Sequence, residues 1–146
     1  MTGLRKLASN LRQRVGELDK EANQLAIRTA ETIVGDLVQV TPVDTSQALS
    51  NWQVGIGSPV DSSISPYFPG EHGSTQSASS AAALDAARAL LRTKKPGQTI
   101  YISNVLRYIG RLNEGSSSQA PAGFVERAVL LGRKFVQNVK LGKGAR

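Results

Sequence analysis

An apolar repeat near the N-terminus constrains the fold of this chain more than any other feature. Its members follow one another at alternating spacings of four and three residues, which places them on one narrow stripe of a helix: Leu4, Ala8, Leu11, Val15, Leu18, Ala22 and Leu25. From Ala26 onward the apolar set widens, so we expect the second half of this helix to be covered on more sides. Continued to about Val40, the helix would extend about 55 Å. Such a length predicts a helix that projects beyond a small globule.

The ends and the partner of this helix follow from a few residues. Gly16 and Gly35 each weaken a helix by about 1 kcal/mol relative to alanine, so a kink or break is allowed at either. Pro42 disfavours the helical conformation at Thr41 and ends the helix. The stripe has two interpretations: it packs on its own domain, or it packs on a neighbouring subunit. In the second case the candidate partner interface is Leu4, Leu11, Val15 and Leu18.

The remaining pattern predicts an α+β fold. Apolar residues alternate with others over Trp52–Gly57 and again over Gln98–Asn104, the period of half-buried strands. We expect these strands to form a small antiparallel sheet, flanked by the long first helix and the last helix. A further helix is expected over 81–92, with Leu84, Ala87 and Leu91 on one face.

Three shorter features are expected around these elements. Asp44, Thr45 or Ser46 can cap a short helical turn that carries Leu49. Another turn is expected at Tyr108–Leu112. The last helix should begin near Pro121, which suits a first turn, and continue to about Val139. Its expected buried residues are Phe124, Ala128, Leu131 and Phe135.

Residues 58–80 are dominated by Ser, Pro and Gly, and nothing in them repeats at the period of a helix or strand. We expect an extended, mobile loop. A loop of this length inside a compact domain is usually either functional or disordered. Tyr67 and Phe68 at its centre are candidate partner contacts.

The bulk numbers favour one domain over residues 1–146. A chain of 146 residues can bury a sizeable core. The absence of cysteine excludes disulfides and thiolate metal sites. The start lacks the apolar run of a secretion signal, and nowhere do about 18 apolar residues follow one another, so we expect neither export nor a membrane partner.

The net charge of +7 is concentrated at the C-terminal end. Residues 105–146 hold eight Lys and Arg against two Asp and Glu, and residues 140–146 form a basic tail. Such a cluster can attract DNA phosphates or acidic protein surfaces, or can simply be a solvated face. The candidate phosphate or acidic-partner contacts are Lys94, Lys95, Lys140, Lys143 and Arg146. Few aromatic residues lie among them, so base-specific recognition is not supported.

No group of residues reaches the pattern of an active, cofactor or metal site. His72 is the single histidine and lies in the Ser/Gly-rich loop, so it forms no metal cluster by itself. Gly55-x-Gly57 follows a predicted strand but lacks the third glycine and the helix that would hold a phosphate. Asp44 suits a helix cap and Glu114 precedes a turn glycine, so structural roles are favoured for both. We therefore expect no catalysis, no cofactor and no metal.

Two stretches, read in order and spacing, resemble a known family. The first is Thr41, Pro42, Val43, Asp44 and Thr45, followed by Leu49 and Trp52; the second is Ile102, Asn104, Tyr108, Leu112, Glu114 and Gly115. Over roughly residues 25–135 the chain resembles the neck or tail-completion family of tailed bacteriophages, small proteins that join the filled head to the tail. The family usually has Gly where this chain has Ser46, and usually connects its halves with a segment shorter than 58–97.

The resemblance implies a structural virion protein rather than an enzyme. It implies a homo-oligomeric ring, most often of six or twelve copies, between the head-closure or connector proteins and the tail terminator. The protein would assemble in the host cytoplasm and reside in the neck of the virion. An alternative function is that of a non-specific DNA-associated protein of the packaging or ejection channel, with the basic C-terminal third on the DNA.

Overall fold

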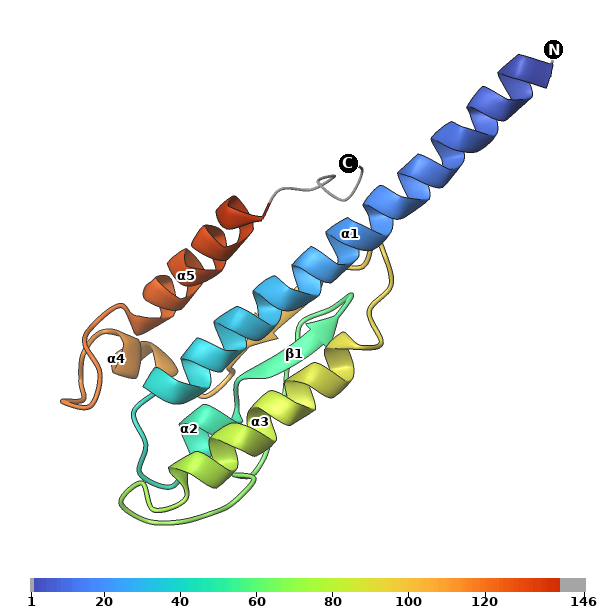
Figure 1. Cartoon of the computed structure of the whole chain (residues 1–146). Coiled ribbons are helices and arrows are strands. Elements are labelled where there is room, and N and C mark those ends of the chain that lie inside the picture. Colours follow the sequence, from blue (N-terminus) through green and yellow to red (C-terminus); the bar gives the residue numbers. More distant parts are fainter. Residues whose placement is uncertain (1, 140–146) are drawn as a thin grey trace.

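A computed structural model describes residues 2–139 and gives a mixed helix and sheet fold (Figure 1). Its elements in chain order are α1 (Thr2–Val40), α2 (Gln47–Ser50), β1 (Gln53–Ile56), α3 (Gln76–Leu91), β2 (Ile100–Ser103), α4 (Ile109–Asn113) and α5 (Phe124–Asn138). The expected α+β class, with long first and last helices and a small antiparallel sheet, is confirmed. Within residues 2–139 no helix has both the length and the apolar character needed to cross a bilayer.

Helix α1 is one unbroken helix of 39 residues, about 58 Å long. The kink or break that the sequence allowed at Gly16 or Gly35 does not occur. The helix ends at Val40, and Thr41 closes its last turn by donating its backbone N–H and its hydroxyl to the Leu37 carbonyl, at 3.0 and 2.5 Å. The end before Pro42 is therefore as expected.

The core surrounds the C-terminal half of α1. Ala30, Val34, Leu37 and Val38 are buried at spacings that keep them on one side of the helix. Helix α5 packs along one side of this half, and the sheet and α3 lie on the other (Figure 1). Trp52 and Val54 join the core from the sheet. The widening of the apolar set after Ala26 thus marks where α1 enters the body of the protein.

Among residues 2–139 the sheet consists of β1 and β2, paired antiparallel with Val54 opposite Ile102 and Gly55 opposite Tyr101. Gly55 is needed here because the chain folds back on the strand after Gly57. A side-chain Cβ at position 55 would lie 2.2 Å from the Ser58 carbonyl oxygen. The Gly55-x-Gly57 pattern is therefore part of a tight return of the backbone.

Residues 57–75 are irregular, but two details differ from the expected mobile loop at 58–80. Helix α3 begins at Gln76, five residues before the expected start, and Ser79 and Ser80 are buried inside it. The segment is also bonded to the body. Ile64 exchanges backbone hydrogen bonds with the buried Asn51 side chain, at 2.8 and 2.9 Å, and the Phe68 N–H and C=O each bond the Ser79 hydroxyl at 3.1 Å.

Replacing Asn51 with alanine tests this tether. The Ile64 N–H and C=O would lose a fully buried partner, so we expect a loss of about 1–3 kcal/mol in the free energy of unfolding. Amide exchange around Ile64 should also become faster. Asn10→Ala, an exposed change on α1, should alter neither quantity. Fast exchange at Ile64 already in the unchanged chain would instead support the mobile loop expected from composition.

The last helix differs from expectation at its start and its buried face, while its end is close to the expected Val139. It begins at Phe124 rather than Pro121, because Gly123 takes a left-handed φ of 81° at its N-cap, and it ends at Asn138. Leu131 is 42% exposed, and the buried residues are Phe124, Ala128 and Gly132. A Cβ on Gly132 would lie 2.7 Å from Ile33, so α5 approaches α1 closely because this residue has no side chain. Phe135 is half-buried.

Candidate functional site

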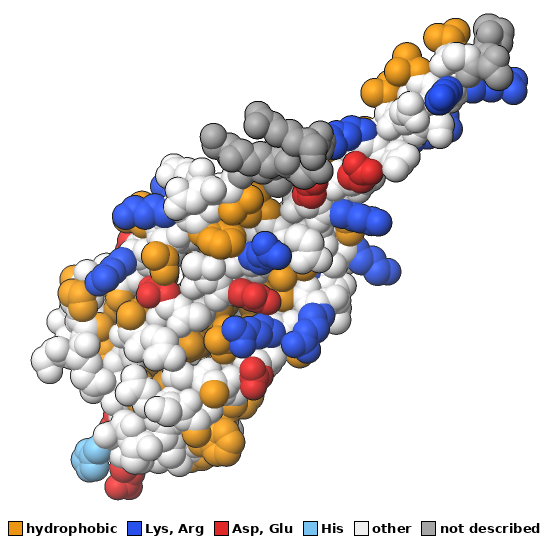
Figure 2. Space-filling model, viewed as in Figure 1, with side chains coloured by type: hydrophobic (Ala, Val, Ile, Leu, Met, Phe, Trp, Pro, Cys, Tyr) orange, Lys and Arg blue, Asp and Glu red, His pale blue; other side chains and the backbone are white. Residues whose placement is uncertain are grey.

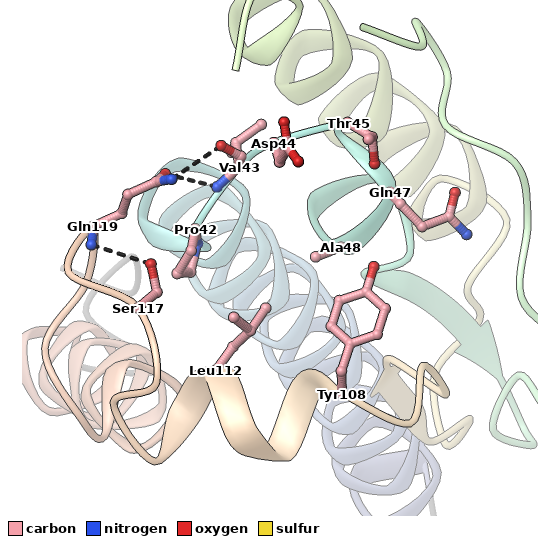
Figure 3. A pocket seen from close by; sticks show the side chains of 10 residues that line it. All are labelled: Pro42, Val43, Asp44, Thr45, Gln47, Ala48, Tyr108, Leu112, Ser117 and Gln119. Carbon is pink, nitrogen blue, oxygen red and sulfur yellow. Dashed lines mark hydrogen bonds between the residues drawn. The ribbon is translucent and has the colours of Figure 1, made fainter. Parts of the chain in front are cut away.

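The two family-like stretches meet in space around a cavity of about 300 Å³ (Figure 3). Residues 42–45 form one wall, and Gln47 and Ala48 of α2 continue it. Tyr108 and Leu112 point into the cavity from the opposite side, and Gln119 lies at one end. The order and spacing of the two stretches therefore reflect a shared location, although about sixty residues separate them in the sequence.

Gln119 clamps the first stretch. Its side-chain carbonyl accepts the Val43 N–H at 2.8 Å, and its amide donates to the Val43 carbonyl at 3.1 Å (Figure 3). This pairing satisfies both polar groups of one backbone residue in the way a neighbouring strand would. The connection before α5 is thereby fixed to the connection after α1.

The polar residues of the first stretch hold the chain together. Thr41 is buried and accepts a hydrogen bond from the Trp52 indole N–H at 2.8 Å. The Asp44 carboxylate accepts the His72 N–H at 2.7 Å, and the Asp44 carbonyl accepts the Gly73 N–H at 2.8 Å. Asp44 therefore binds the 57–75 segment and does not cap α2.

Ser46 is the N-cap of α2, but its side chain makes no capping hydrogen bond. It adopts a left-handed φ of 67°, a conformation in which glycine is favoured. Its hydroxyl instead bonds the Thr75 hydroxyl at 2.8 Å.

The second stretch has similar structural roles. Asn104 donates to the Ala48 carbonyl at 2.9 Å, which joins the end of β2 to α2. Tyr108 precedes α4, and burial raises the pKa of its phenol above the ordinary value. Glu114 follows α4 as its C-cap and is exposed, and Gly115 turns the chain with a φ of 95°.

Asn113, which belongs to neither family-like stretch, adds further hydrogen bonds between α4 and α5. Asn113 donates to both carboxylate oxygens of Glu126, at 3.0 and 2.9 Å, and its own side-chain oxygen accepts the Val125 N–H. These hydrogen bonds from Asn113, and then one from the Glu126 backbone, lower the pKa of Glu126. Nothing in the sequence around Asn113 indicates this role. The role of Asn51 would be easier to find, because asparagine often bonds the local backbone at turns and Asn51 follows the short helix α2.

The cavity holds little reactive chemistry. Asp44 and Tyr108 are the titratable groups that line it, and Asp44 is already bonded to the backbone of His72. The His72 side chain is exposed on the loop. Among residues 2–139, no group of three or more His, Cys, Asp and Glu side chains is arranged to hold a metal ion.

The clearest surface feature is the projecting half of α1, which we define as residues 3–20. Apolar side chains stand exposed along it, with Leu4 65%, Leu11 57% and Val15 56% exposed (Figure 2). Leu18 is 38% exposed. The described part of the chain therefore does not cover the stripe, and packing on its own domain is the wrong interpretation for these four residues. Such a contiguous apolar surface is typical of an interaction site.

A second apolar surface lies on α5. Val129, Leu130, Leu131 and Val136 are each at least 40% exposed. The other candidate contacts, Tyr67 and Phe68, are 38% and 50% exposed in the 57–75 segment. Burial raises the pKa of Tyr67 above that of a free phenol. The molecule thus offers several apolar surfaces on different elements.

The candidate phosphate contacts divide into three groups. Lys94 is only 8% exposed, and its ammonium donates to the Asn23 side chain at 2.5 Å and to the Lys95 carbonyl at 3.2 Å. It joins α1 to the turn after α3 and is not available to a phosphate, which corrects that expectation. Lys95 is exposed. Lys140, Lys143 and Arg146 lie outside the described residues.

No protein-family model, no curated protein and no solved structure matches this chain.

Proposed function

We propose that this chain is a structural subunit of the neck of a tailed bacteriophage, where it forms a ring that joins the head connector to the tail. The observation that carries the proposal is the apolar stripe of the projecting half of α1, exposed on a rigid helix. Covering exposed leucines with another chain removes apolar area from water, so such leucines favour assembly. The protein would act by surface complementarity, without bond chemistry.

The other surfaces fit a subunit with several neighbours. A ring closes when one patch of a protomer binds a different patch of the next, and the exposed apolar residues of α5 and of the 57–75 segment offer two such patches apart from the stripe on α1. The two hydrogen bonds between Val43 and Gln119 fix the connection after α1 to the connection before α5. A subunit that binds two neighbours at once needs such a fixed shape. The resemblance of the two sequence stretches supplies the location in the virion.

Deleting the gene from the phage that encodes it tests the proposal. We expect filled heads and finished tails that remain separate in electron micrographs, with infectious yield reduced at least about a hundredfold because joining needs shape complementarity. The unchanged gene supplied in trans should restore infectivity, and Asn10→Asp should do so equally. Leu11→Asp, one residue away but on the stripe, should not. Normal yield from the deletion phage would refute the neck assignment.

A further inference from the structure

The stripe on the projecting half of α1 has the repeat of a two-stranded coiled coil. In heptad positions a to g, Leu4, Leu11, Leu18 and Leu25 occupy d, while Ala8, Val15 and Ala22 occupy a. No other helix within residues 2–139 pairs with this part of α1, since the leucines before Leu25 are exposed. The repeat therefore requires a helix from another molecule.

We propose that the projecting half of α1 pairs with the same half of a second copy of this chain, antiparallel, with Leu11 of each copy facing Ala22 of the other. The inference stands on α1 alone and does not depend on the neck assignment. Three independent observations support the proposed pairing: the sizes of the stripe residues, the charges that flank the stripe, and the shape of the body where α1 enters it.

The residue sizes favour an antiparallel pair. When two helices run in opposite directions, a positions of one face d positions of the other. Every layer then contains one leucine and one smaller residue: Ala8 with Leu25, Leu11 with Ala22, and Val15 with Leu18. Facing positions of unequal size give layers of uniform volume. A parallel pair would instead stack alanine on alanine and leave those layers poorly filled.

The flanking charges select the same direction and register. Residues 3–14 carry four basic and no acidic side chains, whereas residues 17–21 carry three acidic and one basic. In the antiparallel register Arg12 of one copy faces Asp19 of the other, and Arg14 faces Glu21. Each pairing occurs twice by symmetry. A parallel pair would place the basic ends together, which costs free energy.

The body of the protein has room for the end of the second helix. An apolar groove of about 400 Å³ lies where α1 enters the body, lined by Leu25, Thr29, Ile100 and Val136 among others. Leu25 and Thr29 continue the stripe. The register brings Leu4 of the second copy opposite Thr29, so the apolar end of each helix would enter the groove of its partner.

This contact is two-fold symmetric, because the same surface is used on both copies. It forms pairs and does not by itself close a ring. Any ring contact is then left to other surfaces, among them the exposed apolar residues of α5.

Sedimentation analysis of the full chain tests the pairing. We expect a dimer, with Leu11→Asp shifting the dissociation constant at least about tenfold toward monomer because a charge would be buried in a layer. The neighbouring exposed change Asn10→Asp should leave the dimer intact. A monomer at all concentrations, or association that Leu11→Asp does not weaken, would overturn the proposal.

Charge reversal gives a second, reciprocal test. The double variant Arg12→Glu/Arg14→Glu and the double variant Asp19→Lys/Glu21→Lys should each dimerise more weakly, since all their interchain pairs become repulsive. Mixed in equal amounts, they should form a heterodimer. Absence of preferential heterodimer formation would contradict the proposed register.

Single cysteines determine the direction, because the chain has no cysteine of its own. A disulfide needs Cα atoms within about 7 Å. In the antiparallel register the two copies of position 11 lie about 16 Å apart along the axis, while position 11 lies opposite position 22. A mixture of Leu11→Cys and Ala22→Cys should therefore give the mixed disulfide only. Disulfides between two Leu11→Cys chains would show a parallel pair and refute the inference.

Discussion

Replacing Phe124 with alanine is expected to lower the free energy of unfolding by about 3–5 kcal/mol. Phe124 is 1% exposed at the first turn of α5 and belongs to the core around α1. Its removal would leave a cavity that a small core cannot refill. Urea denaturation followed by circular dichroism measures the loss.

Leu130→Ala is the matched control for this prediction. Leu130 lies on the same helix but is 52% exposed, so its truncation should change the free energy of unfolding by about 0.5 kcal/mol or less. Both variants must be compared at one protein concentration, because self-association raises apparent stability. Equal losses in the two variants would show that α5 is not docked through Phe124.

Replacing Gly55 with alanine should destabilise the protein by about 2–3 kcal/mol or more, although it adds a single methyl group. The methyl carbon would lie 2.2 Å from the Ser58 carbonyl oxygen, and neither atom can rotate away because the backbone fixes the position of both. The strand and the return of the chain would have to separate. The midpoint of urea unfolding should fall accordingly.

Gly16→Ala supplies a control of opposite sign. Gly16 lies inside α1 with no atom within 4 Å of an added Cβ, so alanine should stabilise the helix by about 1 kcal/mol. If Gly55→Ala left the midpoint unchanged or raised it, as Gly16→Ala should, the close approach at Gly55 would not exist as described.

The parts of the fold that repeat locally were predictable. The stripe of α1, its end before Pro42 and both strands follow from spacing within a few residues. Leu131 shows where this reasoning fails. Its spacing from Phe124 and Ala128 suits a buried face, but Gly132 lies against Ile33 because a residue without a side chain allows the two helices to approach. Nothing in the local sequence distinguishes such a glycine from one in a turn.

Several residues of the candidate site could be named from the sequence, but the contacts that bring them together could not. The family resemblance singled out Asp44, Asn104 and Tyr108, whereas their common location depends on tertiary contacts such as the bond between Gln119 and Val43, 76 residues apart in the chain. Lys94 failed for a related reason. Composition counts it as a surface cation, and only tertiary packing places its ammonium against Asn23. The surroundings of such residues depend on partners that are distant in the sequence.

One continuous helix supplies both the exposed tip and the centre of the core. Sharp bends in helices need a proline, an insertion or a lost backbone hydrogen bond, and α1 has none of these between Thr2 and Val40. A force applied at the tip therefore meets no hinge. We therefore expect such a force to act as torque on the buried Val34 and Leu37, which anchor the helix in the hydrophobic interior.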